Sequence, residues 1–113
     1  MPRVVLAFCT CPDAATASRI AEALVGERLA ACVSVLPGVR SVYRWQGNVE
    51  RADEVQLLVK TGADRMHALA ERIIALHPYE LPELVAVEAA AGLPAYLDWI
   101  AAETAPDAGR QEP

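Results

Sequence analysis

Two cysteines and one histidine form the most chemically suggestive group in this chain. Cys9 and Cys11 are two residues apart near the end of an expected strand, so their side chains point to the same side. His77 follows an expected helix and directly precedes Pro78. Two thiolates can hold Cu(I), a soft ion that prefers sulfur ligands. One hypothesis is therefore a copper site at Cys9 and Cys11, and His77 is a further candidate as a metal ligand or titratable group.

The same residues also have a purely structural interpretation. Free cysteine is among the most buried residue types, so Cys9 and Cys32 also fit as small core side chains. His77 at a helix end could satisfy the last helix carbonyls and the negative end of the dipole, with Pro78 enforcing the exit. Nothing in the sequence has the two-pair Cys/His spacing of a structural zinc site. Both interpretations stay open at the level of sequence.

A long predicted hairpin carries the second suggestive group. Tyr43 and Trp45 lie two residues apart on one face of a strand-like run, which ends at a turn over residues 46–48. Residues 49–60 read as the returning strand, and twelve extended residues span about 40 Å. A domain of about 100 residues has a radius of gyration of only about 13 Å. We therefore expect an arm that extends past the core, with Tyr43 and Trp45 packing on a neighbouring subunit.

Hydrophobic periodicity predicts the elements that position these groups. We expect strands over residues 3–10, 30–36, 49–60 and 82–89, and helices over residues 13–28, 64–77 and from 92 onward. Asp13 and Asp64 are the expected N-caps. The order β-α-β-β-α-β plus a terminal helix indicates an α+β, ferredoxin-like sandwich with the first and third strands central and the helices on one face. We expect one domain over residues 1–103 and a disordered tail over residues 104–113, which lack apolar periodicity.

Composition limits the classes of function. A net charge of −5 without clustered lysine or arginine argues against nucleic acid or an anionic membrane as a partner. The longest apolar run is six residues, too short to span a membrane. Three cysteines, an odd number, favour a reduced cytoplasmic protein. The nucleophile elbow, the P-loop, the dinucleotide fingerprint and the zinc-hydrolase helix motif are all missing, so we expect no enzymatic activity and assign no catalytic residue.

A set of residues in fixed order closely resembles the CutA family. The matching positions are Thr10-x-Pro12-Asp13, Leu29-Ala30-Ala31-Cys32-Val33, Pro37-Gly38-Val39-x-Ser41-x-Tyr43-x-Trp45-x-Gly47, Glu54, Lys60-Thr61, His77-Pro78-Tyr79-Glu80-x-Pro82-Glu83, Gly92 and Tyr96-x-x-Trp99. The match covers about residues 4–102. It implies a cytosolic ferredoxin-like protein that forms a homotrimer, similar in architecture to the PII signalling proteins. The family is named for divalent-cation tolerance, above all to copper.

The resemblance also implies roles for single residues. Cys9 matches the family's copper-binding cysteine, and His77 matches the histidine of the same site. Many relatives carry a second histidine where this chain has Leu76, so a three-ligand site here requires Cys11. The implied function is copper tolerance, or a response to metal ions, by a homotrimer that binds copper or another divalent cation at Cys9, His77 and Cys11.

An inter-subunit cleft is the alternative functional site. Glu54 and Lys60 are six residues apart, so both point to one face of the third strand. Glu54 could meet a cationic group of a neighbouring subunit, and Lys60 could face the cleft near Thr10. A surface ion pair, worth little, is the structural interpretation of the same two residues. In the functional alternative, a PII-like signalling trimer binds a small anion or a partner protein in this cleft. The residues expected at the interface or cleft are Tyr43, Trp45, Glu54, Lys60, Tyr79 and Glu80.

Overall fold

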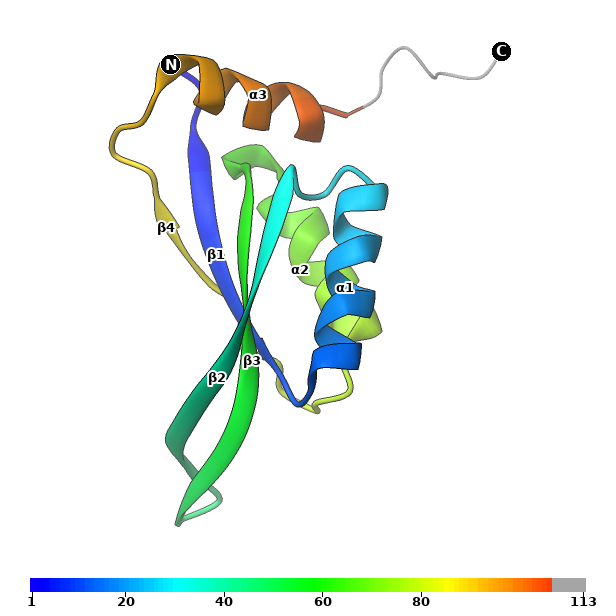
Figure 1. Ribbon diagram of the computed structural model, residues 1–113, viewed down its shortest axis with the longest axis vertical. Coiled ribbons are helices and arrows are strands. Elements are labelled where there is room, and N and C mark those ends of the chain that lie inside the picture. Colours follow the sequence, from blue (N-terminus) through cyan, green and yellow to red (C-terminus); the bar gives the residue numbers. More distant parts are fainter. Residues whose placement is uncertain (107–113) are drawn as a thin grey trace.

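Four antiparallel strands form one sheet, with helices α1 and α2 packed on one of its faces (Figure 1). The computed structural model describes residues 1–106. The strands are β1 (Val4–Cys11), β2 (Cys32–Trp45), β3 (Asn48–Gly62) and β4 (Val85–Glu88), and their order in the sheet is β2-β3-β1-β4. The helices are α1 (Ala14–Gly26), α2 (Met66–Leu76) and α3 (Pro94–Thr104), and a short 3-10 turn, η1 (Ala63–Arg65), precedes α2. The predicted α+β fold with β1 and β3 central is confirmed.

The core lies between the sheet and helices α1 and α2. Alternate residues of β1 and β3 face these helices, because side chains of a strand alternate between its two faces. Cys9 and Leu57, which are register partners, are fully buried there against residues such as Ile20 of α1 and Ile73 of α2. The apolar residues that the sequence places at helical spacing therefore form one contiguous core.

The caps of the two core helices differ from each other. The Asp13 carboxylate accepts a hydrogen bond of 2.8 Å from the Thr16 backbone N–H, so the predicted cap of α1 is confirmed. The predicted cap at Asp64 is wrong. Asp64 lies inside η1, and α2 begins at Met66 without a side-chain cap. The 3-10 turn supplies local backbone bonds at this helix start, which makes a carboxylate cap unnecessary.

The predicted arm is present as the outer half of the β2–β3 hairpin (Figure 1). Its register runs without interruption from Val39↔Glu54 to Trp45↔Asn48, and the shift between Leu36 and Val39 marks a bulge at the expected break. Gln46 and Gly47 close the hairpin, both with positive φ (50° and 83°), as a tight two-residue loop requires. The radius of gyration is 15.1 Å, above the value of about 13 Å for a compact chain of this length.

The sheet face opposite α1 and α2 is apolar and incompletely covered. Leu58, Phe8 and Val85 lie in one row across β3, β1 and β4. Leu6 pairs with Val87 in the neighbouring row. Val85 and Val87 are 57% and 50% exposed, and the other three side chains are half-buried. An exposed apolar sheet face of this kind is typical of a protein–protein contact surface.

The C-terminal helix extends further than the sequence predicted. α3 lies across one end of the sheet (Figure 1) and includes Thr104, which is 1% exposed. The expected tail boundary at residue 104 is therefore wrong by one residue, because Thr104 docks on the backbone of β3. Residues 107–113 of the expected tail lie outside the described residues. Within residues 1–106, no helix combines the length and apolar character needed to cross a membrane.

Thr104→Val should destabilise the protein although it preserves the shape of the side chain. The Thr104 hydroxyl donates to the Ile100 carbonyl at 2.9 Å and accepts from the Gly62 N–H at 3.3 Å. Valine leaves that buried N–H without a partner, which costs roughly 1–3 kcal/mol of unfolding free energy. We expect Tm to fall by several degrees in calorimetry. Ser18→Ala, at an exposed position on α1, is the control, and equal Tm values for both variants would contradict the prediction.

Candidate functional site

The structure brings Cys9, Cys11 and His77 together. Their ligand atoms, the two Sγ atoms and one imidazole nitrogen, all lie within 4.8 Å of one another. β1 supplies both cysteines through its two-residue repeat, and His77 comes directly after α2, which packs on the same face of the sheet. Both cysteines are fully buried and His77 is 7% exposed. The metal-ligand hypothesis and the core hypothesis therefore describe the same place in the molecule.

Both nitrogens of the His77 ring are engaged by the backbone. The Tyr79 N–H donates to Nδ1 at 3.1 Å, so the ring proton is on Nε2, which donates to the Thr10 carbonyl at 2.7 Å. The helix carbonyl of Ile73 is satisfied instead by the backbone N–H of His77 at 2.8 Å. The expected structural role of the imidazole, satisfying carbonyls at the end of α2, is therefore wrong: the ring ties β1 to the loop after α2.

The interaction between the two thiols separates their acidities. The neighbouring Cys11 thiol, followed by burial, raises the pKa of Cys9, whose Sγ donates to the Thr10 carbonyl at 3.9 Å. The interaction with Cys9 lowers the pKa of Cys11. Nearby carboxylates of Glu83 and Glu54 also disfavour a thiolate at Cys9. A metal ion that binds both sulfurs must therefore displace the Cys9 proton.

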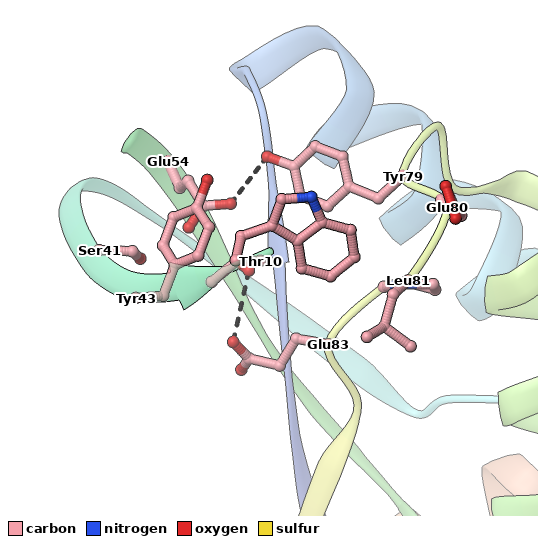
Figure 2. A pocket seen from close by; sticks show the side chains of 10 residues that line it. Thr10, Ser41, Tyr43, Glu54, Tyr79, Glu80, Leu81 and Glu83 are labelled. Atoms are coloured by element: carbon pink, nitrogen blue, oxygen red, sulfur yellow. Dashed lines mark hydrogen bonds between the residues drawn. The ribbon is translucent and has the colours of Figure 1, made fainter. Parts of the chain in front are cut away.

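A cavity of about 570 Å³ lies beside this group, between the arm and the loop after α2 (Figure 2). Three aromatic and three acidic side chains contribute to its wall: Tyr43, Trp45, Tyr79, Glu54, Glu80 and Glu83. The Tyr79 hydroxyl donates to Glu54 at 2.7 Å, and the Thr10 hydroxyl donates to Glu83 at 3.4 Å. Five of the six residues expected at the interface or cleft thus lie around one cavity.

Lys60 does not lie at this cavity. Its Nζ donates to the Tyr96 hydroxyl at 3.3 Å and lies 5.6 Å from the centre of the Tyr96 ring, at the other end of β3 beside α3. The expected position of Lys60 near Thr10 is therefore wrong, because Thr10 pairs with Gln56 and Lys60 pairs with Leu6, at opposite ends of the β1–β3 ladder. Within residues 1–106, Lys60 and Glu54 form no ion pair.

Five residues of the cavity lining were missed as site residues by sequence reasoning: Thr10, Ser41, Leu81, Pro82 and Glu83. Among them, Glu83 carries a carboxylate and Thr10 donates to it. A signal was present for Glu83, since Glu80 and Glu83 flank Pro82 in a short loop that cannot continue a helix. The strand β4 begins only at Val85, three residues later than predicted, and this leaves Pro82 and Glu83 in the loop that borders the cavity.

Comparison with known proteins gives one consistent result. The family model described as CutA1 divalent ion tolerance protein matches residues 5–103. A divalent-cation tolerance protein CutA from Thermus thermophilus is 52% identical over 95 residues, which is 84% of this chain and 92% of that protein.

Solved structures agree with this result. A crystal structure of CutA from Xylella fastidiosa has 54% identity and a TM-score of 0.87, over 89% of this chain and 97% of the other. A PII-like protein CutA from Nostoc has 40% identity and a TM-score of 0.83, over 88% of this chain and 96% of the other. The similarity therefore extends over nearly the whole of each compared chain.

Proposed function

This chain belongs to the family of CutA1 divalent ion tolerance proteins, and from that membership we propose that it acts in copper tolerance as a homotrimer that binds copper. The proposed ligands are Cys9, Cys11 and His77. The observation that carries this proposal is the convergence of their three ligand atoms within 4.8 Å.

The donor set fits copper in its reduced state. Two thiolates and an imidazole are soft or borderline ligands, which Cu(I) prefers to the oxygen ligands of magnesium or calcium. Cys11 supplies the third ligand where Leu76 replaces a possible histidine. Binding requires the His77 ring to exchange one of its two backbone hydrogen bonds for the metal. The site then holds the ion away from water, where it cannot drive redox reactions in solution.

Two surfaces support assembly into a homotrimer. The outer edges of β2 and β4 are the two ends of the sheet, and within residues 1–106 neither is paired with another strand. If the β2 edge of one subunit contacts the β4 edge of the next, the contact is head-to-tail. Three such contacts can close a ring of three subunits. The apolar face around Leu58, Phe8 and Val85 would then be covered. Contact between Tyr43 and Trp45 of the arm and a neighbouring subunit stays a prediction of the same model.

The charge of the cavity does not favour the alternative in which it binds a small anion. Glu54, Glu80 and Glu83 contribute carboxylates to its wall, and the described residues that line it include no lysine, arginine or histidine. Like charge disfavours an anion in such a site. We therefore develop the copper proposal. A cytoplasmic location is part of this proposal, and the three free cysteines support it.

Copper affinity should rise with pH. Protons and copper compete for the same sulfur atoms, and the raised pKa of Cys9 means that its thiol stays protonated throughout the neutral range. Displacing the Cys9 proton should change the apparent dissociation constant at least about tenfold per pH unit, with weaker binding at lower pH. Competition with a chromophoric Cu(I) chelator between pH 6 and pH 8, in the absence of oxygen, measures this slope. An affinity independent of pH would contradict coordination by Cys9.

A further inference from the structure

The cavity beside the Cys/His group combines carboxylate and aromatic side chains in its wall, and its carboxylates have no cationic partner among the described residues that line it. Its volume of about 570 Å³ lies in the range of small-molecule sites in proteins. In Figure 2 the side chains of Tyr43, Glu54, Tyr79 and Glu83 surround it, and they come from the arm, from β3 and from the loop after α2. Because these segments lie far apart in the sequence, the shape of the cavity depends on the whole fold and not on the conformation of one loop.

Glu54 is a buried carboxylate without a cationic partner. Glu54 is only 8% exposed. Its one described hydrogen bond comes from the neutral hydroxyl of Tyr79 at 2.7 Å. Within residues 1–106, no lysine, arginine or histidine nitrogen lies within 4.0 Å of it. Arg40, on the neighbouring strand, pairs instead with Asp53 at 3.3 Å. Burying an unpaired carboxylate is costly, so a cation in the cavity would remove that cost.

Tyr79 acts as a hydrogen-bond donor to Glu54. Burial, followed by the hydrogen bond to Glu54, raises the pKa of Tyr79. The phenol therefore remains protonated and donates its hydrogen bond, and the carboxylate keeps its second oxygen free to accept another donor. The Glu54 carboxylate thus offers a ligand in the cavity both a negative charge and a free hydrogen-bond acceptor.

The aromatic rings select the kind of cation. Tyr43, Trp45 and Tyr79 all line the cavity, and aromatic faces attract organic cations through the ring quadrupole. A hard divalent ion such as Mg²⁺ or Ca²⁺ instead requires six or more oxygen ligands at short distances, in a far smaller space. We propose that this cavity binds a small organic ammonium ion, with its charged nitrogen at Glu54 and its carbon chain along the aromatic rings. Glu80 and Glu83 at the cavity wall suit a ligand with a second ammonium group.

The proposed ammonium site shares no ligand residue with the copper site. Its lining includes neither Cys9 nor Cys11 nor His77. The two sites are in contact through the His77 ring, which bonds the backbone of Thr10 and Tyr79.

Calorimetric titration of the purified full-length, metal-free protein with 1,4-diaminobutane tests the proposal. We expect saturable binding of one molecule per subunit, and no binding of 1,4-butanediol, which has the same length without charge, or of inorganic phosphate. Glu54→Gln keeps the acceptor for Tyr79 but removes the charge, and it should weaken binding at least about tenfold. Glu22→Gln, an exposed position on α1, makes the same charge change and should leave binding unaltered.

A second readout reports on the cavity itself. Trp45 lines the cavity, whereas Trp99 stacks on Tyr96 at a ring distance of 5.6 Å. In a Trp99→Phe background, the diamine should therefore change the fluorescence of Trp45. If Glu54→Gln does not assemble, the double variant Glu80→Gln/Glu83→Gln takes its place and should weaken binding at least threefold. Absence of saturable diamine binding, equal affinity in the charge-removing and control variants, or competition by phosphate would overturn the proposal.

Discussion

Leu58→Glu is expected to convert the assembled protein into monomers while leaving the fold of each subunit intact. Leu58 lies at the centre of the apolar row with Phe8 and Val85, on the face that α1 and α2 do not cover. In an isolated subunit the side chain is half-buried at a surface, so a carboxylate there can remain hydrated. In an oligomer that covers this face, the same carboxylate would be buried without a partner, at a cost of roughly 2 kcal/mol or more per contact.

Sedimentation velocity at micromolar concentration measures this change in oligomeric state. Ile74→Glu is the matched control, because Ile74 is 66% exposed on α2 and the substitution is of the same kind. We expect the control to keep the mass of the wild type.

We also expect the wild-type Tm to fall on dilution, since folding and association are linked by mass action. A wild type that is already monomeric, or a Leu58→Glu variant that keeps the trimer mass, would disprove coverage of this face.

Cys9→Ser/His77→Ala is expected to abolish stoichiometric copper binding. The double change removes two of the three ligand atoms that lie within 4.8 Å of one another, and one remaining thiol cannot hold the ion with comparable affinity. Copper affinity should fall at least about 100-fold. Removal of a residue that only contacts a metal ligand typically lowers affinity by about 10- to 100-fold, and removal of the ligands themselves should have a larger effect. Native mass spectrometry of the reduced protein, titrated with Cu(I), counts the bound ions directly.

Cys32→Ser is the control for this experiment. Cys32 is the third cysteine, half-buried at the start of β2, and it is not part of the converging group. Copper binding should therefore be unchanged in this variant. His77 also ties Thr10 to Tyr79, so Cys9→Ser alone, which keeps the ring contacts, separates loss of a ligand from loss of structure. Equal copper affinity in the double variant and the wild type would refute the assignment of the site.

Local sequence patterns determined the elements and much of their chemistry. The alternation in β1 places Cys9 and Cys11 on one face, because successive side chains of a strand point to opposite sides. Gln46-Gly47 closes the arm, since a two-residue hairpin loop requires positive φ at both positions. Asp13 was predictable as a cap, because its acceptor lies three residues from the N–H that it bonds. Each of these features depends on neighbours along the chain.

Only the tertiary structure decided which distant groups meet. The His77 ring bonds the Thr10 carbonyl, 67 positions away, and no pattern in the sequence states that distance. Thr104 docks on Gly62 across 42 positions, and Lys60 lies beside Tyr96 rather than at the cavity. The sequence predicts Glu54 at the interface or cleft, but only the fold shows that it is buried and accepts a hydrogen bond from Tyr79. The burial and the partners of each side chain depend on which strands pair and on which helices pack against the sheet. The excess of carboxylates around the candidate site is therefore visible only in the folded chain.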